Sequence, residues 1–163
     1  MSAVYKDESG TFEIDLSFAE WSIGSDLHNK FKTVDNFLND VDWVAETTNE
    51  LFLIEFKHFS TPKGNLDDIE KFYQKILRKY YCTAYYLMAC GKQKVMNYYF
   101  VAEAPNLDKV IGKRMKASVH KRLPFNLQQS PEISDRLISE FKVLSVSEWN
   151  EQYPMFPLRR CVS

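Results

Sequence analysis

Three side chains that could together bind a divalent metal ion stand close to one another in the first half of the chain. Asp42 opens one apolar stretch, and Glu55 and Lys57 lie near the end of the next one. Carboxylate oxygens suit Mg²⁺, which usually keeps several of its waters. A bound metal ion makes a water easier to ionise and neutralises charge that develops on a phosphate. These residues indicate hydrolysis of a phosphodiester bond, with Lys57 orienting the water or stabilising the transition state.

A β-hairpin would bring these residues together. The segments 41–47 (VDWVAET) and 51–58 (LFLIEFKH) are rich in residues that favour strands, and Thr48-Asn49 between them is typical of a turn. A loop of these two residues, or a longer one that also includes their immediate neighbours, gives the same pairing of the strands. The sequence therefore predicts a hairpin with a defined register.

In this register Asp42 lies directly opposite Glu55, and both side chains point to the same face of the hairpin. Lys57 joins them because it is two residues beyond Glu55 on the same strand. Two opposed carboxylates repel each other unless a cation lies between them. The alternative is an ordinary cross-strand ion cluster on a solvated face, which would stabilise the fold by only about 0–1 kcal/mol.

Strands and helices alternate along the rest of the chain. Helical connections between strands imply parallel pairing, so we expect an α/β fold with a mixed β-sheet and flanking helices. The expected domain is single and covers 1–163, with a core over about 18–146 and a C-terminal tail over 147–163, where the phrase SVSEWNEQYPMFPLRR is typical of a short helix followed by a tail. The elements predicted around the hairpin are a strand over 11–16, a helix over 18–31 broken near Gly24, a helix from Asn65 to about Gly91, a strand over 95–102, a helix over 107–122 and a strand over 141–146.

The composition limits the functional classes. The 21 Lys and Arg residues nearly balance the 22 Asp and Glu residues, so net charge alone indicates neither a nucleic-acid nor a membrane partner. The three cysteines lack C-x-x-C spacing and predict neither a disulfide framework nor a zinc site. Without a long apolar run or a signal-peptide pattern, we expect a cytoplasmic protein with no membrane partner.

The helix expected over 107–122 contains no acidic residue from Lys109 onward. Lys109, Lys113 and Lys116 share one face at helical spacing, with Arg114 beside them, and an apolar stripe occupies the opposite face. Such a basic face could bind the phosphates of a nucleic acid. The alternative is a solvated helix face, since lysine commonly occupies exposed positions.

These residues, in this order, resemble the PD-(D/E)XK, or restriction-endonuclease-like, phosphodiesterase superfamily. The match consists of Asp42 at the start of one hairpin strand and the Glu-Phe-Lys tripeptide at 55–57 on its partner, followed by a helix and a further strand. The resemblance covers about residues 41–102, and the phrase VDWVAETTNELFLIEFKHF is also similar to small bacterial proteins with this core. Val41 departs from the proline that often precedes the acid in the superfamily.

The resemblance implies a restriction-endonuclease-like core and a nuclease, dependent on Mg²⁺ or Mn²⁺, that hydrolyses DNA. It implies Asp42, Glu55 and Lys57 as catalytic residues, and Asp42, Glu55 and Phe56 as the metal ligands. The superfamily often supplies a further acid from an N-terminal helix, for which Glu20 is the candidate; the alternative for Glu20 is a surface helix acid. A non-catalytic module that binds nucleic acid or a protein partner is the alternative function, and a homodimer is an open alternative for the assembly.

Overall fold

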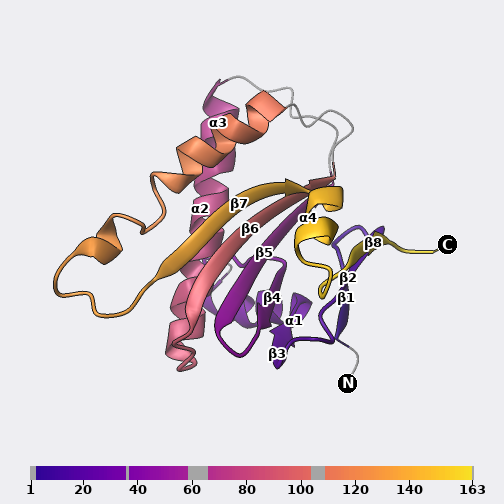
Figure 1. The fold of residues 1–163 in the computed structure, drawn as a ribbon, viewed down its shortest axis with the longest axis horizontal. Helices are drawn as coiled ribbons and strands as arrows, with labels where there is room; N and C mark the ends of the chain where they lie inside the picture. The colour runs from indigo at the N-terminus through magenta and orange to yellow at the C-terminus, as the bar shows by residue number, and fades with distance from the viewer. Residues whose placement is uncertain (1–2, 36, 59–65, 104–108, 163) are drawn as a thin grey trace.

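The protein has an α/β fold in which helices flank a mixed sheet (Figure 1). The computed structural model of the chain describes residues 3–35, 37–58, 66–103 and 109–162. Its elements, in chain order, are β1 (Val4–Lys6), β2 (Phe12–Asp15), β3 (Trp21–Ile23), α1 (Ser25–Phe31), η1 (Lys32–Val34), β4 (Trp43–Glu46), β5 (Glu50–His58), α2 (Leu66–Ala89), β6 (Val95–Glu103), α3 (Lys109–His120), η2 (Leu127–Gln129), β7 (Ile138–Ser145), α4 (Val146–Gln152) and β8 (Leu158–Arg160).

The larger sheet has the strand order β3-β4-β5-β6-β7. The strands β3, β4 and β5 pair antiparallel, whereas β5, β6 and β7 pair parallel through the connections that contain α2 and α3. This arrangement confirms the expected α/β class with a mixed sheet and flanking helices. A second, antiparallel sheet with the order β1-β2-β8 joins the two ends of the chain.

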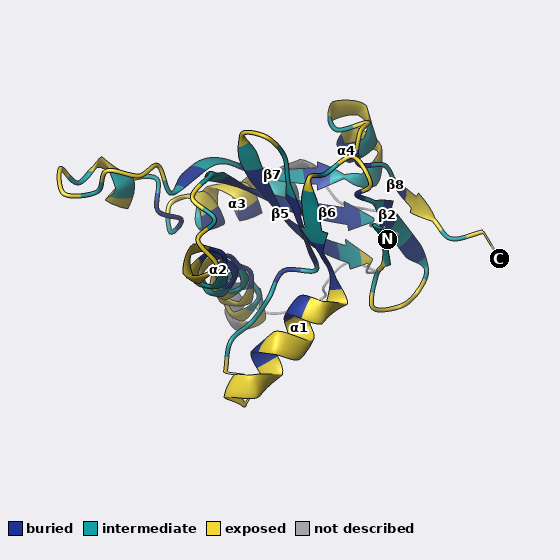
Figure 2. Ribbon diagram, turned by 90° about the horizontal axis from the view of Figure 1, so that it is seen from below, coloured by how far each residue is buried: buried dark blue, intermediate teal, exposed yellow. Residues whose placement is uncertain are grey.

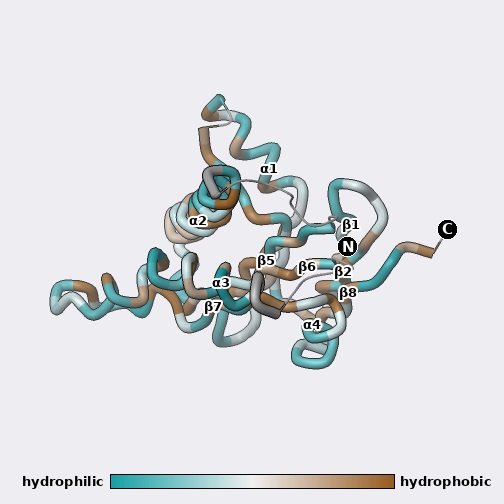
Figure 3. Tube along the Cα trace, turned by 90° about the horizontal axis from the view of Figure 1, so that it is seen from above, coloured by the Kyte–Doolittle hydropathy of each residue, from teal (hydrophilic) through white to brown (hydrophobic). Residues whose placement is uncertain are grey.

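Both faces of the larger sheet are covered. The helices α1, α2 and α3 lie on one face, and the small sheet and α4 lie on the other (Figures 1 and 2). Successive residues of a strand point to opposite faces, so Tyr98 and Phe100 of β6 pack toward the helices while Tyr99 and Val101 pack toward the small sheet. Figure 3 shows the hydrophobic positions of β5 and β6 between these two layers.

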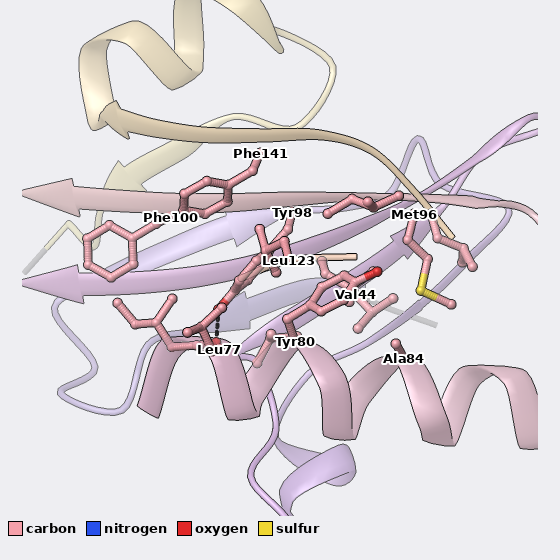
Figure 4. Close-up of a cluster of buried hydrophobic side chains, with 14 of the residues drawn as sticks. Val44, Leu77, Tyr80, Ala84, Met96, Tyr98, Phe100, Leu123 and Phe141 are labelled. Carbon is pink, nitrogen blue, oxygen red and sulfur yellow. Dashed lines mark hydrogen bonds between the residues drawn. The ribbon is translucent and has the colours of Figure 1, made fainter. Parts of the chain in front are cut away.

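The long helix α2 follows the predicted apolar pattern. Ile76, Tyr80, Ala84 and Leu87 are buried against the sheet at intervals of three or four residues, and Figure 4 shows Tyr80 and Ala84 facing the strands. Gly91 ends the helix with a φ of +76°, a conformation that glycine adopts without steric cost. The predicted end near Gly91 is therefore confirmed.

The segment expected as a helix over 18–31 is helical only in its second half. Trp21–Ile23 instead forms β3, which pairs with β4. The break lies at Gly24, where a Cβ atom would stand 2.4 Å from Cδ1 of Tyr5, so the close approach of that ring requires glycine. The helical prediction over the first half of this segment was wrong because pairing at the sheet edge decides its conformation.

The C-terminal segment contains the expected short helix, α4, and in addition the strand β8. Helix α4 begins with a capping box in which the Ser145 hydroxyl accepts a hydrogen bond from the Glu148 N–H and the Glu148 carboxylate accepts one from the Ser145 N–H. Trp149 is fully buried, and its indole N–H donates a hydrogen bond to the Phe156 carbonyl at 2.7 Å.

None of the helices in the described part of the chain combines the length and the apolar character that a membrane span requires.

Candidate active site

The hairpin of β4 and β5 has the predicted register. Trp43 pairs with Ile54, which places Asp42 opposite Glu55 at the next position along the strands. Asp42 is also bound to the partner strand directly, because the backbone N–H of Phe56 donates a hydrogen bond to its Oδ2 atom at 2.8 Å. The structure therefore holds the Asp42 carboxylate at the end of the hairpin far from the turn.

Glu55 is fully buried and is held by two lysines. Lys79 Nζ lies 2.8 Å from each of its carboxylate oxygens, and Lys57 Nζ lies 3.0 Å from Oε1. A buried carboxylate needs such partners, since an unpaired charge in the interior is strongly destabilising. Asp42, Glu55 and Lys57 are therefore brought together as predicted, and Lys79 is a fourth member that the sequence analysis missed.

The spacing of Lys79 from the apolar residues of α2 could have predicted that its side chain faces the sheet. Lys79 lies three residues after the buried Ile76 and four residues before the buried Thr83. These spacings put Lys79 on the sheet-facing side of the helix, where a lysine needs an acidic partner. Glu55 is the buried acid on the strand that α2 covers.

The carboxyl group of Asp42 has a strongly raised pKa. Burial, with the nearby Glu55 carboxylate as the second cause, raises the pKa of Asp42 from 3.8 to about 7. Lys79, Lys57 and the hydrogen bond from Phe56 act in the opposite direction but do not cancel this effect. Ionised Asp42 beside ionised Glu55 is unfavourable, and a cation bound between them would relieve the conflict.

Lys57 keeps its proton at neutral pH. Its partial burial acts to lower the pKa, but the Glu55 and Asp42 carboxylates outweigh burial and raise the pKa above its ordinary value of 10.5. Lys57 is therefore an ammonium group, which can donate hydrogen bonds and stabilise negative charge but cannot accept a proton from water. This protonation state fits electrostatic stabilisation and water orientation, the two roles predicted for Lys57.

A cavity of about 230 Å³ opens onto Asp42 and Lys57. Its remaining lining comes from Phe56, His58 and the turn between β1 and β2, which contributes Asp7, Glu8 and Ser9. Two larger cavities, of about 380 and 400 Å³, lie along α2, and none of the four cluster residues lines either of them. Solvent thus reaches the cluster from the Asp42 and Lys57 side.

The two acids of this turn differ in their surroundings. The Asp7 carboxylate accepts hydrogen bonds from the Phe12 N–H at 2.7 Å and from the Ser9 hydroxyl, which stabilise the turn and help to lower the pKa of Asp7 against the effect of burial. Glu8 is exposed, and its charge acts on Lys57. Neither acid could be predicted as a site residue from the sequence, because the turn reaches the cavity through long-range packing of the small sheet.

Glu20 does not join the cluster. Its N–H donates a hydrogen bond to the Glu46 carbonyl, and its carboxylate binds the Thr48 hydroxyl at 2.8 Å and Lys94 at 3.1 Å. Glu46 is four residues from Asp42 along the strand direction, a separation of about 13 Å. The structure therefore places Glu20 at the turn end of the hairpin and outside any helix.

The basic residues predicted on α3 are exposed where the structure describes their side chains. Lys113, Arg114 and Lys116 face solvent, while Met115 and Val119 are buried on the opposite side of the helix. The side chain of Lys109 lies outside the described residues. The amphipathic pattern is confirmed for this part of α3, and its role in binding nucleic acid stays a prediction.

Comparisons with protein-family models, with curated proteins and with solved structures give no match. The resemblance to the PD-(D/E)XK superfamily therefore stays a prediction.

The cluster offers a small number of oxygen atoms that could bind a metal ion. The described residues contain no group of three or more His, Cys, Asp or Glu side chains that could hold one. Asp42 and Glu55 supply two carboxylates, and the Phe56 carbonyl is the backbone oxygen that the resemblance implies as a further ligand. Two hard oxygen ligands plus water suit Mg²⁺ or Mn²⁺ and do not suit a structural zinc ion.

Proposed function

We propose that this protein is a nuclease that requires Mg²⁺ or Mn²⁺ and hydrolyses phosphodiester bonds of DNA. The observation that carries the proposal is the position of Asp42 at the end of the hairpin, where it accepts a hydrogen bond from the Phe56 N–H, borders the open cavity and has its pKa raised to about 7 by burial and by the nearby Glu55 carboxylate. Carboxylates in such conflict are typical of cation sites and of catalytic sites. The resemblance to the PD-(D/E)XK superfamily rests on the same residues and supports the same function.

Each residue of the cluster would have a separate task. Asp42 and Glu55 would hold the metal ion, with the Phe56 carbonyl as the further ligand. When bound, the ion would supply an easily ionised water and neutralise charge on the phosphate. Lys57, as an ammonium group at the cavity, would hydrogen-bond the attacking water or a phosphate oxygen. Partial burial of the cluster strengthens these electrostatic interactions relative to water.

The exposed basic residues of α3 are the candidate contacts to the DNA backbone. β5 and β6 are parallel, with Lys57 beside Ala102, so both strands end at the same edge of the sheet. Only residues 104–108 separate the end of β6 from the start of α3. This short connection keeps the beginning of α3 near the edge that carries the cluster, and Lys113, Arg114 and Lys116 extend from there.

A second candidate function is a non-catalytic module that keeps this fold and binds nucleic acid or a protein partner. One observation favours it: Glu55 is already paired with Lys57 and Lys79, so two ammonium groups balance the two carboxylates of the cluster. A buried cluster with balanced charge can persist as a structural feature. Binding of Mn²⁺ separates the two functions.

The test measures cleavage of single- and double-stranded DNA and RNA with Mg²⁺, with Mn²⁺ and with a chelator. We expect cleavage that requires metal and prefers DNA, reduced by about 100-fold or more in Asp42→Ala and Lys57→Ala. Lys75→Ala is the matched control, because Lys75 is exposed on α2. Unchanged activity in both site variants would overturn the proposal, and a folded wild type that neither cleaves nor binds Mn²⁺ would favour the second function.

A further inference from the structure

We infer that Lys79 is an internal counterion, which positions Glu55 in the metal-free protein and competes with the divalent ion for this carboxylate. The inference deepens the proposed function and rests on it, because it assigns Glu55 as a metal ligand. It concerns a residue of α2 that is distant in sequence from the Glu-Phe-Lys tripeptide of the hairpin.

The first support is the contact geometry. Lys79 Nζ lies at the same distance, 2.8 Å, from both oxygens of Glu55, so one ammonium group spans the whole carboxylate. The Lys79 side chain is only 11% exposed and Glu55 is fully buried. A cation that binds both oxygens of Glu55 would occupy the place that this ammonium group now holds.

The second support is the difference between the two lysines. Lys57 comes from the same strand as Glu55, contacts one oxygen, lines the cavity and is 28% exposed. It can leave Glu55 for the cavity and remain solvated there. Lys79 does not line that cavity, so an equivalent move into solvent on that side is closed to it.

The third support is the fixed position of α2. Buried Ile76 and Tyr80 pack on the sheet on either side of Lys79, and the Tyr98 hydroxyl donates a hydrogen bond to the Ile76 carbonyl at 2.9 Å (Figure 4). One turn later, the Thr83 hydroxyl accepts a hydrogen bond from the Val41 N–H. The backbone of α2 on either side of Lys79 is therefore held against β6 and against the segment just before β4.

These contacts have a predictable effect on metal binding. A positive charge next to Glu55 opposes the approach of a divalent cation, while its two hydrogen bonds orient the carboxylate without metal. Removal of this charge should tighten metal binding even though it weakens the fold. A lysine with a purely structural role would give only the loss of stability.

The experiment is a titration of the full chain with Mn²⁺, followed by the electron paramagnetic resonance signal of the free ion, at about pH 8.5, above the raised pKa of Asp42. The variants are Lys79→Gln, Lys79→Met and Lys79→Arg. Glutamine keeps a hydrogen-bond donor for Glu55, so Lys79→Gln still tests the inference if Lys79→Met does not fold. Lys75→Met is the control, since it removes the same charge from an exposed position of the same helix.

We expect Mn²⁺ affinity to rise roughly tenfold in Lys79→Gln and Lys79→Met, with lower unfolding midpoints in urea. Lys79→Arg and Lys75→Met should retain the wild-type affinity. Unchanged or weaker affinity in Lys79→Gln would overturn the inference, while a wild type that binds Mn²⁺ and cleaves DNA would leave the proposed function standing. Absence of Mn²⁺ binding in the wild type and in all variants would overturn both.

Discussion

The hydroxyl of Thr83 accepts a hydrogen bond from the backbone N–H of Val41 at 3.1 Å, and this bond fixes the residue directly before Asp42. Thr83 and Val41 are both fully buried. Because Thr83 follows Lys79 by one helical turn, a single face of α2 contacts both Glu55 of β5 and the segment just before β4. The helix thus positions Asp42 through Val41 and positions Glu55 through Lys79.

Replacement of Thr83 by valine should destabilise the fold by roughly 1–3 kcal/mol, because the buried Val41 N–H would lose its acceptor while the side-chain shape is kept. The free energy of unfolding, measured in urea, checks this value. Thr83→Ser is the control: it retains the hydroxyl and should lose only about the 1 kcal/mol of a buried methyl group. Equal losses in the two variants would contradict a role for the hydrogen bond.

The raised pKa of Asp42 predicts how stability depends on pH. The carboxyl group ionises near its ordinary pKa of 3.8 in the unfolded chain and near 7 in the folded chain, where burial and then Glu55 disfavour the charge. Between these values the folded state binds more protons, so this group makes the protein less stable as the pH rises from about 4 to about 7. Above about pH 7 both states are ionised, and the loss stops growing.

Asp42→Asn should remove this dependence, because asparagine can still accept the hydrogen bond from Phe56 but carries no charge. We expect the free energy of unfolding of the metal-free variant to rise, relative to that of the wild type, by on the order of a few kcal/mol as the pH increases from about 4 to about 7. Urea unfolding at several pH values measures the difference. Asp135→Asn, on an exposed loop, should follow the wild type, and parallel curves for Asp42→Asn and wild type would contradict the raised pKa.

The basic face of α3 predicts a salt-dependent contribution to DNA binding. Combined replacement of Lys113, Arg114 and Lys116 by glutamine should weaken binding and reduce the slope of log affinity against log salt by about 2–3, the number of phosphate contacts removed. Fluorescence anisotropy with a chelator present measures binding without cleavage. The control replaces two exposed lysines at the end of α1 and in η1, Lys30 and Lys32. An equal change of the salt slope per replaced charge in this control would mean that α3 has no special role in DNA binding.

The hairpin and α2 could be predicted from the sequence because their signals are local. Strand propensity on both sides of a short turn determined the register, and the resulting register placed Asp42 opposite Glu55. The apolar spacing of α2 and the glycine after it likewise lie within one stretch of chain. The parallel pairing of β5 with β6 follows once a helix is recognised between them.

The small sheet could not be predicted in this way. β2 pairs with β8 from the other end of the chain, as in the pairing of Glu13 with Arg159, and strands of three or four residues carry little pattern. The acids of the β1–β2 turn reach the cavity through the packing of this small sheet on β5, as in the contact of Phe12 with Phe56. Lys79 was missed for a related reason: its helical position was predicted, but its partner was a buried acid far away in sequence.

Glu20 provides the sharpest test of where the sequence and the structure disagree. As a catalytic acid it would be required for cleavage, whereas the structure pairs it with Lys94 and Thr48 at the turn end of the hairpin, beside Glu46, which lies about 13 Å along the strand from Asp42. Glu20→Gln should therefore retain Mn²⁺ affinity and cleavage within about twofold and leave the urea unfolding midpoint nearly unchanged, since exposed ion pairs contribute little to stability. Glu55→Gln, measured in the same assays, should lose both metal binding and cleavage. A tenfold or larger loss of cleavage in Glu20→Gln would require Glu20 to approach the cluster and would contradict the hairpin-end position described above.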